Sequence, residues 1–224
     1  MCCAVPVQPR MRIVIIFILL FNTNSVFPQQ SKLSKAVNYL SDFIASDHFV
    51  ELKETNSDLA LVDSIYLRAI AFTEEDYGEA LLAITFTTIT YKEVPLVIPL
   101  FSSIVNFPLI SADDSTFNLK NINLPQKLFF DSPNKKYGDK DKLAHFFGNA
   151  YLGYSQNIFD LSDLIGYFVE SFEESFKVQS KVDYRDLDVN WYGDLFGKLL
   201  KDNSKLLPSQ IMLIRSLNYF SFTL

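Results

Sequence analysis

Asp141, His145 and Asn149 are spaced four residues apart in a segment whose other residues are mostly apolar. In a helix this spacing places all three side chains on one face, within about two turns. An aspartate one turn before a histidine can orient the imidazole for general acid–base catalysis. Buried histidines that bond to aspartate and asparagine are also common in purely structural networks, and the spacing alone favours that interpretation.

A later segment repeats the same spacing with Asp186, Asn190 and Asp194. Gly193 and Gly197, four residues apart, leave one side of this segment without side chains, so another helix can approach it closely. Two polar rows in apolar surroundings satisfy each other when their helices pack face to face. We therefore expect the histidine of the first row to lie opposite the asparagine of the second.

Acidic residues lie between the two rows, at Glu170, Glu173 and Glu174. A helix over 161–176 would carry them near its C-terminal end, where the helix dipole disfavours negative charge. The chain has two histidines and no HExxH motif, so we predict neither a metal nor another cofactor, and we assign His48 to the surface or a loop without a role. The candidate catalytic residues are His145, Asp141, Glu170 and Glu174, and the candidate ligand-binding or structural residues are Asn149, Asp186, Asn190, Gly193 and Gly197.

These residues require helices to position them, and the periodicity of apolar residues predicts a mainly α fold with a small β element. Residues 94–110 are rich in β-branched residues and contain prolines, which is typical of edge strands or extended segments. Residues 79–91 fit a helix or a strand, and we favour a helix. The predicted helices span 33–46, a segment from about 58, 79–91, 139–156, 161–176 and 184–201; 111–138 is expected to be a polar connector, and 211–224 is apolar without an assigned type.

The N-terminus has the parts of a secretory signal peptide. Two arginines precede nine unbroken apolar residues, Ile13 to Phe21, and a polar stretch follows. Nine residues cover only about half of a bilayer as a helix, so a membrane anchor is the poorer interpretation. Cleavage is expected near Ser25 or near Gln29. This divides the chain into a signal peptide (1–29), an N-terminal helical region (30–138) and a C-terminal helical region (139–224).

Composition limits the possible functions further. The chain has 224 residues, 49% of them hydrophobic, with 21 Phe and 11 Tyr, which is ample material for a core. Loss of 1–29 removes two of the 20 basic residues and none of the 26 acidic ones, so the net charge becomes −8. That charge disfavours binding to nucleic acid or to anionic lipid. Both cysteines leave with the signal peptide, which excludes disulfides, thiolate metal sites and lipid attachment at a mature N-terminal cysteine.

The C-terminal region also resembles known families. The segment 141–146, DKLAHF, resembles the DKxxHF motif that opens the YfiM-like periplasmic proteins and the related VanZ-like family. The later residues with the spacing DxxxNxxGxxxG are similar to a second VanZ-like element, and Glu170 or Glu174 matches the acidic position expected between the motifs. The resemblance covers about residues 139–200. It implies an association with the cell envelope and supplies no reaction.

Two features depart from the VanZ-like pattern. VanZ-like proteins cross the membrane several times, whereas the predicted helices here contain Asp, Glu and Lys throughout and are too broken to span, so we expect no stable membrane span after signal cleavage. The arginine usual before the second motif has Lys181 as its nearest basic candidate, because Arg185 lies too close to it.

Three functional hypotheses follow. The protein is a periplasmic or secreted envelope protein whose polar network is structural and which contacts an unknown envelope component. Alternatively, it is an envelope hydrolase with His145 as general base and Asp141 orienting it. A third possibility is a module that binds a small polar or cationic ligand at the acidic helices. An open pocket around His145 would favour the second or third hypothesis, whereas mutually bonded, buried side chains would favour the first.

Overall fold

The computed structural model describes residues 30–98, 103–155 and 184–223, and Lys32–Leu224 form one compact unit. The predicted signal peptide and the predicted helix over 161–176, with Glu170, Glu173 and Glu174, lie outside the described residues. So does Lys181.

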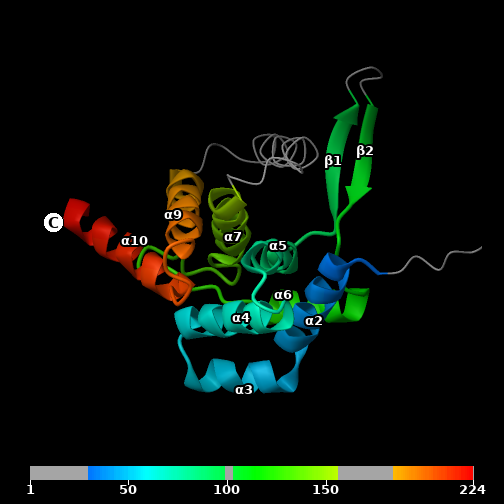
Figure 1. Ribbon diagram of the computed structural model, residues 1–224, viewed down its shortest axis with the longest axis horizontal. Helices are drawn as coiled ribbons and strands as arrows, with labels where there is room; N and C mark the ends of the chain where they lie inside the picture. Colours follow the sequence, from blue (N-terminus) through cyan, green and yellow to red (C-terminus); the bar gives the residue numbers. More distant parts are fainter. Residues whose placement is uncertain (1–29, 99–102, 156–183, 224) are drawn as a thin grey trace, which may run out of the picture. The chain divides into compact units, whose positions relative to one another are not determined.

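The described part of the chain is mainly helical with one small sheet, as the sequence predicts (Figure 1). Each segment predicted as a helix within this part is one, including the ambiguous 79–91, and the C-terminal apolar segment is helical as well. Its helices are α2 (Lys32–Ala45), α3 (Asp47–Thr55), α4 (Asp58–Phe72), α5 (Tyr77–Thr88), α6 (Asp114–Asn123), α7 (Lys140–Ser155), α9 (Tyr184–Leu200) and α10 (Pro208–Thr223).

Two short helices were not predicted. Helix α3 has almost no apolar periodicity, and Phe49 is its one buried residue. Ser46 caps this helix by accepting a hydrogen bond from the Phe49 amide at 3.2 Å. His48 lies in the first turn of α3 with an exposed side chain rather than in a loop. The segment expected as a polar connector contains α6, which Asp113 caps through the Thr116 amide at 3.1 Å.

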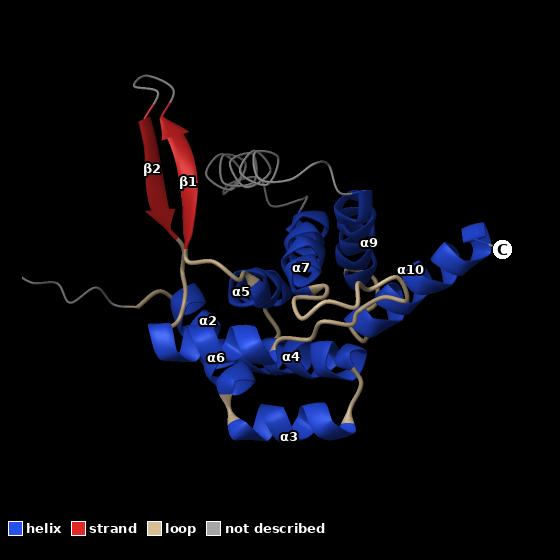
Figure 2. Ribbon diagram, turned by 180° about the vertical axis from the view of Figure 1, so that it is seen from behind, coloured by secondary structure: helices blue, strands red, loops and turns tan. Residues whose placement is uncertain are grey.

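The two strands, β1 (Glu93–Ile98) and β2 (Ser103–Pro108), form an antiparallel hairpin (Figure 2). The Leu109 amide donates to Lys92 O at 2.8 Å, so the neighbouring pair Glu93–Pro108 is a non-hydrogen-bonded pair, and so is Pro95–Asn106. Both prolines therefore stand where an amide would point away from the partner strand. They cost no ladder bond, and they remove one donor from each outer edge, which protects the edges against further strands.

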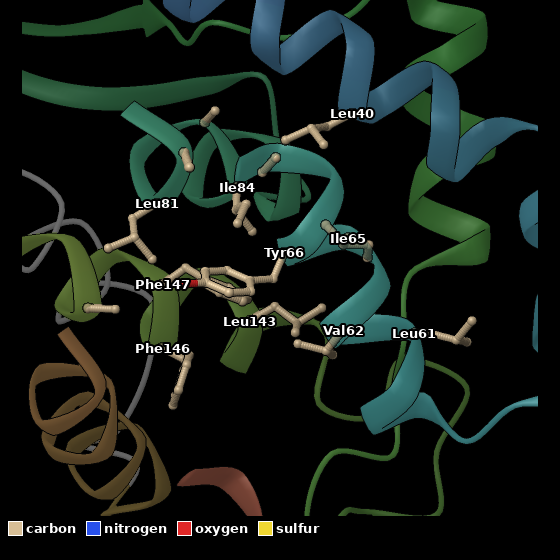
Figure 3. Close-up of a cluster of buried hydrophobic side chains, with 14 of the residues drawn as sticks. Leu40, Leu61, Val62, Ile65, Tyr66, Leu81, Ile84, Leu143, Phe146 and Phe147 are labelled. Atoms are coloured by element: carbon tan, nitrogen blue, oxygen red, sulfur yellow. The ribbon is translucent and has the colours of Figure 1, made fainter. Parts of the chain in front are cut away.

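The main core is built around Tyr66 of α4. Figure 3 shows its ring among side chains from α4, α5 and α7, including Ile84, Leu143 and Phe147. The ring also meets Phe196 of α9 edge-on, with centroids 5.6 Å apart. The core thus takes side chains from the segments before and after residues 111–138. Each fully buried large apolar side chain contributes about 1.5–3 kcal/mol to stability. This shared core fixes the positions of α7 and α9.

Candidate functional site

The helices α7 and α9 lie side by side and touch through their backbones (Figures 1 and 2). A Cβ atom added to Gly193 would stand 2.3 Å from Phe146 O, and one added to Gly197 would stand 2.0 Å from Ala150 O. Gly153 of α7 lies equally close to the α9 backbone, because its Cβ would meet Asp194 O at 2.5 Å. The flat side predicted for α9 is therefore the surface on which α7 packs.

Close packing brings the two polar rows together. His145 Nδ1 lies 3.0 Å from Asn190 Oδ1, and Asn149 Nδ2 donates to the same oxygen at 2.8 Å. Asn149 Nδ2 also donates to His145 O at 2.9 Å. An amide oxygen only accepts hydrogen bonds, so Nδ1 carries the hydrogen and Nε2 is the basic nitrogen of the neutral ring. The predicted pairing of His145 with Asn190 is confirmed.

Lys142 adds a buried cation to this cluster. Its side chain is 4% exposed, and its Nζ donates to Asp141 Oδ2 at 2.8 Å and to Asp186 Oδ1. Burial alone would lower the pKa of this ammonium, but the hydrogen bonds and charges of the two carboxylates outweigh burial and raise the pKa above its usual value. The sequence analysis did not single out this lysine, although it lies three residues before His145 and therefore on the same face of α7.

A carboxylate of α9 also lies near the histidine. Asp186 Oδ1 is 3.7 Å from His145 Nε2, so Asp186 lies between Lys142 and the imidazole. Asp141, which the sequence analysis expected to orient His145, has its hydrogen bond with Lys142. The side chain of His145 is 12% exposed. The cluster is thus a partly buried chain of polar groups: Asp141, Lys142, Asp186, His145, Asn190 and Asn149.

The third member of the second row does not join this cluster. Asp194 bonds to Lys198 on its own helix, with the Lys198 Nζ 2.6 Å from Asp194 Oδ2. It lies on the side of α9 where Gly153 approaches. Asp194 therefore lies one helical turn after Asn190, beyond the point where α9 meets His145 and Asn149 of α7.

A second charged network lies at the N-terminal end of α9. Arg185 Nε donates to Asp131 Oδ2 at 2.9 Å, and Arg185 Nη2 donates to Asp139 Oδ1 at 2.8 Å. From α10, Arg215 binds Asp131 through two nitrogens and also donates to Asp188 Oδ2 at 2.6 Å. Burial alone would raise the pKa of Asp131, but the two arginines outweigh it and lower the pKa to about 2.

Sequence reasoning missed this second network entirely. Asp131 and Arg215 are 84 residues apart, and no spacing within one element connects them. The sequence offered only single acidic and basic residues on separate segments, and such residues usually lie on a protein surface. The network joins the loop before α7 to α9 and α10, and Asp139 within it is fully buried.

Among the described residues, no three His, Cys, Asp or Glu side chains are grouped so that they could hold a metal ion. No helix in the described part of the chain has the length and apolar character needed to cross a bilayer. No family model, curated protein or solved structure matches the chain.

Proposed function

We propose that the protein is an exported component of the cell envelope in which a structural polar network, centred on His145, locks α7 onto α9. The apolar run at 13–21 and the two motifs of the C-terminal region support export and an envelope location. The role of the folded domain in this proposal is to present a rigid surface to another envelope component rather than to transform a substrate.

The observation that carries this proposal is the shared acceptor Asn190 Oδ1. It receives His145 Nδ1 and Asn149 Nδ2 from α7, at 3.0 and 2.8 Å, while the histidine side chain is 12% exposed. Polar atoms buried in this way cost about 1–3 kcal/mol each when they lose their partner. The network therefore favours one register of α7 on α9, the one in which the glycines also meet the opposite backbone.

Replacement of the histidine tests this role. We expect His145→Ala to lower the free energy of unfolding by about 1–3 kcal/mol, because Asn190 Oδ1 loses a donor inside the helix pair. His145→Asn, whose side-chain amide can donate at the Nδ1 position, should recover part of that loss. Chemical denaturation followed by circular dichroism measures both. If His145→Ala keeps full stability, the network is not structural.

The location is tested separately. Fractionation of the producing cells should recover the protein outside the cytoplasm, and N-terminal sequencing of it should begin after residue 25. A protein that stays in the membrane fraction with residues 13–21 intact would contradict export. This experiment does not depend on the stability of the helix pair.

One observation favours a catalytic role as the second candidate. With Nδ1 held by Asn190, the basic nitrogen of the neutral ring is Nε2, and Asp186 lies 3.7 Å from it. An acid–base role would then use Asp186 beside His145, in place of the expected Asp141. In that case His145→Ala keeps stability and abolishes hydrolysis of envelope material. The cationic-ligand hypothesis has less support, because Lys142 already occupies the space between Asp141 and Asp186.

A further inference from the structure

Lys120 of α6 is a buried lysine that is not part of either charged network. The residue is 1% exposed, and its Nζ donates to Ile89 O at 2.7 Å and to Asn121 Oδ1 at 2.6 Å. Neither acceptor carries a charge. No salt bridge of Lys120 is present within the described residues. Such an environment suits a neutral amine better than an ammonium ion, because a buried charge without a counter-charge is costly.

The groups bonded to Lys120 belong to the segment that carries the hairpin. Residues 89–92, here named the connector, join α5 to β1. Besides accepting from Lys120, the connector accepts a hydrogen bond at Thr90 O from Asn121 Nδ2 at 3.3 Å. Its Lys92 pairs with Asp114 at the start of α6. The connector is therefore attached to α6 by three polar contacts, and Lys120 makes the fully buried one.

An apolar cluster at the same place shows what the connector supports. Ile89 packs with Val94 of β1, with Leu109, which follows β2, and with Ala144 of α7. Phe86 and Tyr91 pack against these side chains. The base of the hairpin is thus held by a small cluster of its own, separate from the main core. A change at Ile89 O would reach both strands through this cluster.

The charges around Lys120 oppose its protonation. Lys92, in the connector, and Lys140, at the start of α7, are both positive neighbours, and Lys140 Nζ donates to Ile122 O at 3.2 Å. Asp114 faces Lys92 and is exposed, while the Phe117 ring, with its centroid 4.3 Å from Lys120 Nζ, gives a cation–π contact that favours the ammonium. Burial and then the two lysines lower the pKa of Lys120 to about 7.

Two tyrosines also lie in or near the connector. Burial raises the pKa of Tyr91 above its usual value. It also raises the pKa of Tyr137, whose hydroxyl lies 2.7 Å from Thr90 Oγ1, so both phenols stay neutral. Burial also lowers the pKa of Lys140, but this lysine bonds to the backbone of α6 and not to the connector. Lys120 is therefore the titratable group with a lowered pKa whose hydrogen bond holds the connector.

We propose that Lys120 is a pH-sensitive latch: as a neutral amine it holds the connector on α6, and as an ammonium ion it releases the connector and loosens the base of the β1–β2 hairpin. The released lysine reaches water, where its charge is solvated. The proposal concerns the hairpin and is independent of any role of His145.

Hydrogen exchange of the full-length protein tests the latch. Exchange is measured by mass spectrometry between about pH 6 and pH 8.5 and corrected for the intrinsic effect of pH. Peptides that cover the connector and residues 105–112 should exchange at least about tenfold faster at the lower pH, because each pH unit below the ordinary lysine pKa and above the lowered one favours the open form about tenfold. Peptides from α2 should not change.

Two variants make the test specific. Lys120→Met should remove the pH dependence of exchange at the connector, whereas Lys198→Met, which removes an exposed lysine, should keep it. Wild-type protein without such pH dependence, or Lys120→Met with the wild-type dependence, would overturn the proposal. If Lys120→Met does not fold, NMR of Cε-labelled lysine in the wild-type protein decides the question: a signal that titrates near pH 7, and at higher pH in Lys92→Met, supports the latch, and its absence contradicts it.

Discussion

Lys142 differs from the other members of the α7–α9 cluster because it is a charged side chain that is almost fully buried. Its Nζ bridges Asp141 on its own helix and Asp186 on the other helix. Pairs of this kind add little net stability compared with an apolar replacement of the whole group. Removing one partner alone is costly, because the remaining charges stay behind without compensation. The lysine thus supplies the counter-charge for both carboxylates where the two helices meet.

We predict that Lys142→Met lowers the free energy of unfolding by about 3 kcal/mol at neutral pH, since Met keeps the volume and leaves two carboxylates uncompensated. Urea unfolding at neutral pH measures this loss. Lys198→Met removes a half-exposed lysine with one carboxylate partner, and it should change stability by less than about 0.5 kcal/mol. Equal effects of the two substitutions would contradict a special role of Lys142.

At the level of helices, the pairing of α7 with α9 depends on positions where only hydrogen fits. We predict that Gly197→Ala destabilises the protein by about 1–3 kcal/mol, because the new Cβ would stand 2.0 Å from Ala150 O and the two backbones must separate. Gly148 on α7 is the matched control. A Cβ there would meet only Thr85 Cγ2, at 3.5 Å, which is an ordinary contact.

Gly148→Ala should therefore raise stability by about 0.5–1 kcal/mol through the better helix propensity of alanine. Thermal unfolding of both variants gives the comparison. Should Gly197→Ala also stabilise, the close approach of α7 and α9 would not exist in solution, and the pairing of His145 with Asn190 would be lost with it.

The helices that sequence reasoning found are those with an apolar face. Strong periodicity made α2, α4 and α7 predictable, because each buries a regular row of side chains. The short helix α3 buries one residue, and α6 has a polar surface, so capping residues were the only signals for them. Proline and β-branched residues sufficed to predict an extended or β element at 94–110, whereas the antiparallel pairing and its register follow only from the coordinates.

The site was predictable to the same extent. The spacing of polar residues gave the face of each helix, and the glycines gave the face that packs, so the pair His145–Asn190 followed from the sequence. The spacing did not give the partner of Asp141, because Lys142 and Asp186 meet only after α7 and α9 have a definite register. Buried Lys120 was invisible for another reason: its acceptor Ile89 O is a backbone atom on a distant segment.

At the level of the whole compact unit, charged side chains connect the elements that the apolar core joins less extensively. Asp63 of α4 accepts hydrogen bonds from the Ser209 amide at 3.0 Å and from its hydroxyl at 2.6 Å, and so caps α10 from another helix. Further along α10, Arg215 connects the helix to Asp131 and Asp188. The exposed apolar side chains of α10 are numerous, so these polar contacts matter for its position.

The last prediction concerns Asp131, which holds Arg185 and Arg215 together. Its pKa, about 2, is lower in the folded protein than in the unfolded chain, so its stabilising contribution is fully present above about pH 4 and disappears as the pH falls toward 2. We predict that Asp131→Asn lowers the free energy of unfolding by about 3 kcal/mol at pH 7, because buried Arg215 loses its bidentate partner. The difference from wild type should narrow below about pH 4. Asp194→Asn, which affects a single ion pair along α9, should cost less than about 0.5 kcal/mol. Unfolding curves recorded from about pH 2 to pH 7 decide the matter: a difference that stays constant over this range would mean that Asp131 acts through its shape and not through its charge.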